Sequence, residues 1–475
     1  MTSNIDRQLF IRLSMWINEL QDYIPVGTVI HDNNPSASHR IGFSGFTYDR
    51  SYIDKKYPAI DPAHLDPQKD GGKFTTKSLN GKVLDYFSEF LPGEFSQSLL
   101  VNIDQRWRHL SEGEKLYIMT IAHGDFGAAQ LNPQYDQFND PISGLDKLNE
   151  LVQAIRDFQL TGLLSPVTKE LQGALCSFKG TKPKIDYVVE REGLAQRFVT
   201  KLNTSKYYND ARVANLFTSL EMNAGLNVCK TYVVKLDCGE DVLFSKNYTR
   251  SERFNQNDDL RILYKYNRIS FKTLLADDPF LNNTQRPTYK HIAHAIDKYS
   301  DDPITDKEEL FRRAIMSAAT NHTSNGLDNL EMYDKGMGKW RLSPSFHNLP
   351  NPMTDTQFDV SFNDSLMTGN LLRLDESFVE ELGKQLNILP TKSMALAFCV
   401  TSSLINIEKN MGVHELSIQD RETIRNCIKL NDVSLLHKKF ENNENVQKIM
   451  TSTLNLSNSD SHHTTDFQTQ RGPTM

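Results

Sequence analysis

Along this chain, apolar residues first recur with the spacing of β-strands and later with the spacing of α-helices. Residues 9–17 alternate apolar and polar side chains, and residues 23–30 form a second apolar stretch that could pair with them as an antiparallel hairpin. Strand-like segments dominate residues 184–245, with one helical pattern inserted at residues 211–223. After Arg250 the spacing is mostly helical, with polar loops. The sequence therefore predicts an α+β protein with a β-rich beginning and a helical end.

The composition favours a folded intracellular protein and argues against direct binding to nucleic acid. Of the 475 residues, 38% are hydrophobic and 24% charged, so the chain can bury a core, and its length suggests two or three domains. The net charge of −7 does not suit autonomous binding to DNA, RNA or an anionic membrane. Five cysteines without a CxxC pair fit a reducing compartment. The longest apolar run, residues 394–400, is too short to span a bilayer. We expect a soluble, cytoplasmic protein without a signal peptide.

Shifts in composition divide the chain into four expected parts. Asn, Pro, Asp and Gly cluster near residues 133–145, which marks a domain boundary. The tail is rich in Ser, Asn, Thr and His and has almost no apolar residues, so we expect it to be disordered. The expected parts are an N-terminal subdomain at 1–135, a mixed lobe at 136–250, a helical lobe at 251–450 and a tail at 451–475.

Two neighbouring segments carry the strongest motif of the chain. The first reads Thr320-Asn-His-Thr-Ser-Asn-Gly-Leu-Asp-Asn329, and the second reads Trp340-Arg-Leu-Ser-Pro-Ser-Phe-His347. Together they resemble the active-site region of the HipA family of bacterial toxin kinases, whose pattern is Thr-Asp-Asp/Gly-His-x-x-Asn followed by Trp-Arg-Leu-Ser-Pro-x-Tyr/Phe-Asp. Weaker similarities lie, in the family's order, between residues 9 and 440: Val26-Gly27, Phe46–Tyr52, His123–Ala129 and Asp306–Arg313. The resemblance implies a protein-kinase-like fold of two lobes with an additional N-terminal β-rich subdomain.

Phosphoryl transfer requires donors around the phosphates, a strand lysine, carboxylates that hold Mg²⁺ and a carboxylate base. The resemblance places the strand lysine at Lys201, within Phe198-Val-Thr-Lys-Leu202, and a hinge segment at 245–250 that includes Lys246. The family's phosphate loop, Ser-x-Ser-Gly-x-Gln-x-Lys, matches residues 170–177 only at Gly173. Its lysine position there holds Ser177. The resemblance thus implies nucleotide-binding positions at Gly173, Lys201, Lys246 and Asn329.

The family's acidic residues are missing from the motif. Ser324 stands at the position of the catalytic aspartate, and a neutral hydroxyl is a far poorer proton acceptor than a carboxylate. The metal-binding asparagine is retained as Asn329, but His347 replaces the metal-binding aspartate, and Mg²⁺ prefers oxygen ligands. His322 or Asp328 could substitute as the base if the loop were remodelled.

The helix that should supply the lysine's glutamate partner differs from the family as well. The glutamate position falls at Ala214, and Glu221 lies about two turns later on the same expected helix. We expect Glu221 to be too far along the helix to serve as the partner of Lys201.

These substitutions leave three functions open. The first is a pseudokinase that acts by protein contact, with a HipB-like helix-turn-helix antitoxin or another protein, and reaches DNA only through that partner. The second is an active serine/threonine kinase toxin with a displaced base, acting on a translation component and using ATP and Mg²⁺. The third is a different transfer chemistry on the same fold, for which the sequence offers no positive sign.

Overall fold

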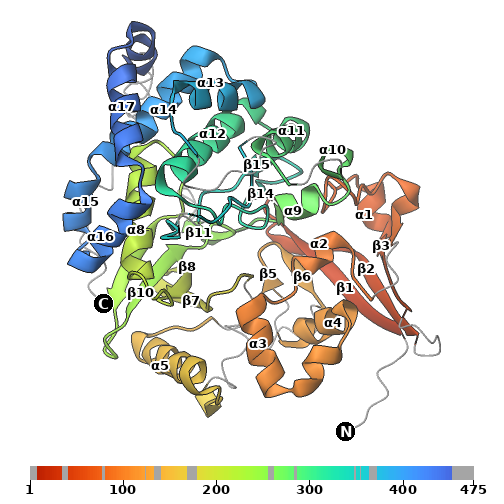
Figure 1. The fold of residues 1–475 in the computed structure, drawn as a ribbon. Helices are drawn as coiled ribbons and strands as arrows, with labels where there is room; N and C mark the ends of the chain where they lie inside the picture. The colour runs from red at the N-terminus through yellow and green to blue at the C-terminus, as the bar shows by residue number, and fades with distance from the viewer. Residues whose placement is uncertain are drawn as a thin grey trace. The chain divides into compact units, whose positions relative to one another are not determined.

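The computed structural model describes residues 8–34, 41–76, 81–122, 125–132, 141–167, 179–254, 261–282, 286–346, 349–353, 355–362 and 372–451 (Figure 1). The chain divides into two compact units, each built from segments that are separated in the sequence. The first unit comprises Met1–Thr204, Lys235–Asp278 and Glu331–Ser343, and the second comprises Ser205–Val234, Pro279–Leu330 and Pro344–Met475. Apart from Thr451, the predicted tail lies outside the described residues, and the four expected parts stay a prediction.

The first unit begins with a six-stranded sheet in the order β4-β3-β2-β1-β6-β5. The predicted hairpin is confirmed, because β1 pairs antiparallel with β2 from Gln8 opposite Asp32 to Ile17 opposite Asp22. The alternating residues of β1, from Leu9 to Ile17, are buried as the period of two requires. The strands are β1 (Gln8–Ile17), β2 (Asp22–Asn34), β3 (Ile41–Tyr48), β4 (Lys73–Thr75), β5 (Asp125–Phe126) and β6 (Ala129–Leu131).

Helices lie between and after the strands of this sheet in the described part of the sequence. They are α1 (Arg50–Asp54), α2 (Asp85–Ser88), α3 (Glu94–Ile103), α4 (Glu112–Ala122) and α5 (Leu145–Thr161). Helix α4, which contacts β1, starts with a capping box. The Ser111 N–H donates to Glu114 Oε2 (2.7 Å), and the Glu114 N–H donates to Ser111 Oγ (3.2 Å). These two hydrogen bonds fix the start of α4.

A second, four-stranded sheet has the order β7-β8-β10-β9. Its strands are β7 (Lys184–Arg191), β8 (Leu194–Leu202), β9 (Thr231–Lys235) and β10 (Asp241–Lys246), close to the predicted segments. Glu192 and Gly193 connect β7 to β8 and both have positive φ (53° and 74°), as a type I′ hairpin turn requires. This turn fixes the register in which Lys184 lies opposite Lys201.

Strands also occur between residues 250 and 342, where the sequence had indicated helices and polar loops. A hairpin of β11 (Arg250–Phe254) and β12 (Arg261–Lys265) is followed by a three-stranded sheet in the order β13-β14-β15. These last strands are β13 (Arg268–Ser270), β14 (Glu331–Asp334) and β15 (Trp340–Leu342). Each is short, and β13 pairs with a strand far along the chain, so no local alternation of apolar residues announces them.

The second unit is helical around α12 (Pro303–Thr320), which is buried along most of its length and contacts α11, α13, α14 and α17. Asp302 caps α12, and Pro303 occupies its first turn. Helix α8 (Asp210–Asn223) belongs to this unit and packs against α14 and α15. The others are α11 (Tyr289–Tyr299), α13 (Glu376–Gln385), α14 (Pro390–Ile405), α15 (Ile407–Val413), α16 (Ile418–Cys427) and α17 (Leu430–Glu441), with short α9 (Phe271–Leu274) in the first unit and α10 (Pro279–Asn282) in the second.

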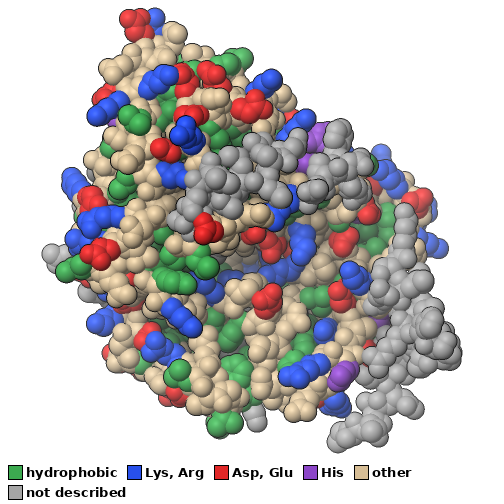
Figure 2. Space-filling view, viewed as in Figure 1, with side chains coloured by type: hydrophobic (Ala, Val, Ile, Leu, Met, Phe, Trp, Pro, Cys, Tyr) green, Lys and Arg blue, Asp and Glu red, His purple; other side chains and the backbone are tan. Residues whose placement is uncertain are grey.

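A break at Asn406 separates α14 from α15. Among the described residues, no single helix has the length and apolarity needed to cross a membrane, although α13 and α14, bent by 118° at their junction, pass that test as a pair. Acidic and basic side chains are interspersed over the face shown in Figure 2.

Candidate functional site

The loop that follows α12 brings Ser324 and Asn329 together. Asn321 ends the helix in the left-handed conformation (φ 53°), and its Nδ2 donates to the Asn351 carbonyl (2.6 Å). Ser324 is exposed, while Asn329 is half-buried. The Asn329 Nδ2 donates to the backbone carbonyl of Ser324 (3.1 Å). The loop therefore keeps two of the predicted site residues in contact, but the residue at the base position offers only a hydroxyl.

The side chain of Asn325, next to Ser324, has a structural role. It is buried, its Nδ2 donates to Tyr289 Oη (2.9 Å) and to the Val360 carbonyl (3.2 Å), and its Oδ1 accepts from the Val360 N–H (3.0 Å). These bonds fasten the loop to residues 358–361. Because the amide nitrogen and the amide oxygen of Asn325 are both hydrogen-bonded, this side chain stabilises the loop and does not act as a proton acceptor.

His322 is buried and held as a neutral imidazole. Its Nδ1 lies 2.8 Å from the Leu349 carbonyl, which can only accept, so Nδ1 carries the proton. Burial lowers the pKa of His322 to about 4. With Glu221, Arg313, Asn329 and Ser345 it lines a polar cavity of about 30 Å³, large enough for an ordered water. A base with so low a pKa accepts protons weakly at neutral pH.

Two carboxylates flank the same loop at Gly326. A Cβ added there would lie 2.7 Å from Asp328 Oδ1 and 3.4 Å from Asp359 Oδ2. The Asp359 N–H donates to the Thr323 carbonyl (3.0 Å), which places this residue beside the base position. Burial and the charge of Asp328 raise the pKa of Asp359. Sequence reasoning named Asp328 but missed Asp359, because Asp359 comes from a separate segment that no local pattern connects with the loop.

Glu221, on the last turn of α8, is buried and bound within its own unit. Ser345 Oγ donates to Glu221 Oε1 (3.1 Å). Ser345 is further fixed through its N–H, which donates to the Asn227 carbonyl (2.7 Å), and its carbonyl, which accepts from the Cys229 N–H (2.8 Å). Glu221 thus anchors the segment that leads to His347. His347 itself, and Gly173, lie outside the described residues.

The strand register of the first unit places Lys201 and Lys246 on opposite faces of their sheet. Lys201 of β8 lies opposite Leu243 of β10, whereas Lys246 lies opposite Phe198. Side chains alternate along a strand, so residues 198 and 201 point to different faces. Their two ammonium groups therefore cannot meet at one ligand from a regular strand. A contribution of the segment around Lys246 would have to come from its backbone.

Lys201 instead faces a second lysine, Lys184, to which the sequence motifs did not point. Lys184, the first residue of β7, is only partly exposed and lies directly opposite Lys201. Burial, followed by the charges of Lys201 and Arg268, lowers the pKa of Lys184 to about 7. The Glu192-Gly193 turn was the available signal, because a two-residue turn there sets residues 184 and 201 opposite each other.

Arg268 and Glu331 form an ion pair near these lysines. We refer to Lys184, Lys201, Arg268 and Glu331 as the charged cluster. Arg268 Nη1 and Glu331 Oε1 are 2.5 Å apart, with side chains 21% and 8% exposed, and Tyr248 Oη also donates to Glu331. Burial opposes ionisation of Arg268, but Glu331 raises the pKa of the guanidinium. The ion pair thus lies in a largely buried setting.

Glu89 holds a further cation at the edge of the cluster. Its carboxylate accepts from Lys179 Nζ (2.8 Å) and from the hydroxyls of Ser270 and Thr273. Burial alone would raise the pKa of Glu89, but Lys179 and Arg268 lower it to about 2. The carboxylate therefore stays ionised and paired with Lys179.

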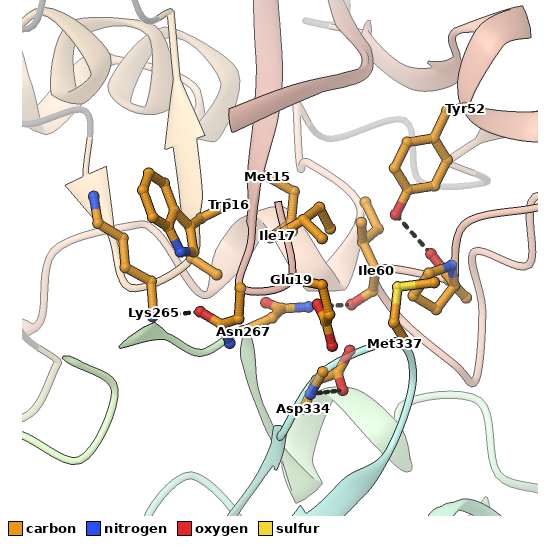
Figure 3. A pocket seen from close by; sticks show the side chains of 15 residues that line it. Met15, Trp16, Ile17, Glu19, Tyr52, Ile60, Lys265, Asn267, Asp334 and Met337 are labelled. Atoms are coloured by element: carbon orange, nitrogen blue, oxygen red, sulfur yellow. Dashed lines mark hydrogen bonds between the residues drawn. The ribbon is translucent and has the colours of Figure 1, made fainter. Parts of the chain in front are cut away.

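A separate small pocket of the first unit, about 30 Å³, contains none of the predicted site residues (Figure 3). The Asp334 carboxylate accepts from the N–H groups of Gly336 (2.8 Å) and Gly338 (2.9 Å), which shapes the turn between β14 and β15. Burial, and less strongly Glu19, raise the pKa of Asp334. Lys265 Nζ lies 5.1 Å from the centre of the Trp16 ring. Asp334, which lines the pocket, therefore has a structural role, because its hydrogen bonds hold the turn.

Within the described ranges, no group of three or more His, Cys, Asp and Glu side chains is arranged to hold a metal ion. The retained Asn329 is therefore not accompanied by a cluster of charged ligands there.

Comparison with known proteins supports the fold. No protein-family model matches the chain, and no curated protein is significantly similar to it. A solved structure of the HipA–HipB toxin–antitoxin system of Shewanella oneidensis MR-1 with its operator DNA is similar over 91% of this chain and 96% of that chain, with 12% identity and a TM-score of 0.61. The Helicobacter pylori proinflammatory kinase CtkA matches 55% of this chain and 93% of its own, with 12% identity and a TM-score of 0.40, too low to support an argument.

The chain thus has a mixed α+β fold. That fold is HipA-like, as the sequence motifs implied. At 12% identity the likeness concerns the fold alone.

Proposed function

We propose that this protein is a HipA-like pseudokinase that acts by contact with another protein. The observation that carries the proposal is the residue at the base position, where exposed Ser324 replaces an aspartate. Its neighbours do not compensate through the loop itself, since Asn325 is a hydrogen-bonded bracket and His322 is a buried neutral imidazole. A general base needs a pKa near the working pH and reach to the substrate proton.

The same proposal holds for the metal. Mg²⁺ binds through carboxylates, carbonyls and waters, and the family's metal aspartate is replaced by His347. The Asn329 Nδ2 donates a hydrogen bond to the Ser324 carbonyl, so this amide also stabilises the loop. We propose that ATP–Mg²⁺ does not bind productively to this protein.

The proposed partner is a HipB-like helix-turn-helix protein. In the Shewanella structure, HipA is found together with HipB and operator DNA. The net charge of −7 and the mixture of acidic and basic side chains in Figure 2 favour contact with DNA through such a partner and not through this chain itself.

Thermal unfolding with ATP, in the presence and absence of Mg²⁺ or Mn²⁺, tests the proposal. Ligand binding raises the unfolding temperature by mass action. We expect no shift that depends on the metal and no transfer of phosphate to the protein or to casein. A clear metal-dependent shift together with phosphate transfer would contradict a pseudokinase.

One observation favours the alternative, an active kinase toxin with a displaced base. Asp359 delivers a carboxylate of raised pKa beside the base position, held there by the Thr323 carbonyl. If this alternative holds, phosphate transfer is detectable, the variant D359N loses it, and the exposed control D355N keeps it. The variant D328N tests whether the neighbouring carboxylate of Asp328, and not that of Asp359, acts as the base.

A further inference from the structure

Three turns of the first unit meet around the small pocket shown in Figure 3. They are Asn18–Gln21 between β1 and β2, Lys55–Pro58 after α1, and Lys335–Lys339 between β14 and β15. A Cβ added at Gly336 would lie 2.8 Å from Glu19 Oε1. One added at Gly338 would lie 3.1 Å from Pro58 Cβ. The last turn therefore touches the other two, and we call the joint outer face of these three turns the three-turn surface.

Each of the three turns is held in a fixed conformation and contains a residue other than glycine with positive φ. These residues are Gln21 (51°), Lys56 (56°) and Met337 (53°). The Gln21 side-chain amide exchanges two hydrogen bonds with the backbone of Leu263 (3.0 and 2.9 Å). Tyr52 Oη donates to the Pro58 carbonyl (2.7 Å), and the Asp334 carboxylate holds the third turn. Left-handed backbone of this kind is costly and clusters at binding sites. The surface is thus preorganised, which reduces the ordering that binding requires.

Two large apolar side chains are exposed on the three-turn surface. Leu20 is 54% exposed and Met337 is 46% exposed. They belong to turns that touch, because Glu19, next to Leu20, lies against Gly336, next to Met337. The Asp334 carboxylate accepts from backbone N–H groups on both sides of Met337, so the turn that exposes this methionine is a fixed one. Methionine is flexible and polarisable, which suits it to contact with a partner surface.

Lysines accompany these apolar side chains on the three turns. The exposed lysines of the turns are Lys55, Lys56, Lys335 and Lys339. The exposed acid of the same turns is Glu19. The residues that flank the turns add Asp22, Asp334, whose carboxylate is bonded within its own turn, and Asp54, which pairs with Arg50 (3.1 Å). In a chain with a net charge of −7, this excess of cations on three adjoining turns favours an acidic partner segment.

We propose that the three-turn surface docks an acidic protein segment that carries an apolar side chain. The apolar side chain packs on Leu20 and Met337, and the carboxylates around it pair with the lysines of the turns. A uniformly anionic membrane suits the surface less well, because the carboxylates of Glu19 and Asp22 lie at and beside the same turns. The inference goes beyond the proposed function, since it uses no residue of the kinase motifs and holds whether or not the protein transfers phosphate.

Fluorescence anisotropy with short labelled peptides tests the surface on the full-length protein. The first peptide places a leucine among aspartates and glutamates, the second replaces that leucine with serine, and the third replaces the acids with lysines. We expect the first peptide to bind at low salt, the second to bind several-fold more weakly, and the third not to bind. Added salt should weaken binding, because it screens exposed charges. Absence of binding by the first peptide, or equal binding by the first two, would overturn the proposal.

Charge reversal locates the binding on the three-turn surface. The double variant K335E/K339E should bind the first peptide about tenfold more weakly at low salt, because it opposes the carboxylates of the peptide. The matched control K147E/K235E reverses two exposed lysines of α5 and β9 and should bind as the wild type does. Equal losses in the two double variants would show that the net charge of the protein matters and not this surface, and would overturn the site.

The variant M337G separates binding from folding. Glycine adopts positive φ without strain, so this variant should not lower the unfolding temperature. It removes the exposed apolar side chain, so its affinity for the first peptide should fall several-fold. Unchanged affinity would show that Met337 takes no part in docking.

Vesicles that contain phosphatidylserine and a short DNA duplex are tested with the same variants. Binding to either one that K335E/K339E loses, without a preference for the leucine peptide, would assign the surface to a membrane or to nucleic acid and overturn the proposal. Since none of these variants changes Ser324 or Asp359, failure here leaves the ATP-binding and phosphate-transfer tests of the proposed function unaffected.

Discussion

The charged cluster of the first unit and the loop Thr320–Leu330 of the second unit accommodate buried polar groups in different ways. In the cluster, the buried carboxylate of Glu331 pairs with the guanidinium of Arg268. In the loop, the buried polar side chains are neutral and hydrogen-bonded, as His322 and Asn325 show, while the acidic Asp328 is exposed. The loop therefore keeps its conformation without an ionised group at the base position. A preserved loop shape is thus no sign of preserved catalysis.

The largest expected effect is a loss of stability when Glu331, the carboxylate of the charged cluster, is removed. The variant E331A leaves Arg268 largely buried and without its carboxylate partner, which costs about 3 kcal/mol. Urea unfolding measures the loss, and the variant E190A, at an exposed position of β7, serves as the control with almost no change. A loss as small as that of the control would show that the cluster does not depend on pairing.

The stability of the protein should depend on pH through His322 of the loop Thr320–Leu330. Folding holds this imidazole neutral with a pKa of about 4, so the unfolded chain binds one more proton between the ordinary value of 6.5 and about 4. Stability therefore falls as the pH falls through that window, by roughly 3 kcal/mol in total. The variant H322N should flatten this part of the stability–pH curve, and the exposed-site variant H294N should leave it unchanged.

The hydrogen bonds of Asn325 should contribute less to the free energy of unfolding. The variant N325A removes the bonds to Tyr289 and Val360 and leaves their buried groups without those partners, at a cost of about 2 kcal/mol. Chemical denaturation provides the value, and hydrogen exchange at residues 358–361 should speed up. If the exchange rates there stay as in the wild type, the loop is held by other contacts.

The smallest effect is expected for Asn329, the residue that the family uses for the metal. The variant N329A loses one partly exposed hydrogen bond to Ser324, worth about 1 kcal/mol or less. Adding Mg²⁺ should not alter the difference between variant and wild type. A difference that grows with Mg²⁺ would mean that Asn329 binds the metal after all.

The sequence indicates the parts of this molecule that are fixed by neighbours along the chain. The hairpin of β1 and β2 follows from the alternation of residues 9–17, and the loop with Ser324 and Asn329 was indicated by the motif that resembles the HipA family. It misses Asp359, which joins the loop from another segment, and the pairing of Arg268 with Glu331, which lie 63 positions apart. Such contacts depend on how distant segments pack, and no periodic pattern records them.

The division of the chain into interleaved segments has a consequence for synthesis on the ribosome. The first unit includes Glu331–Ser343, which supplies β14 and β15, so its three-stranded sheet cannot form until that segment has left the ribosomal tunnel. Until then the edge of β13 that β14 covers is unpaired, a state in which strands are prone to misassociate. A truncation before residue 343 should therefore yield an aggregating product and not an isolated first unit.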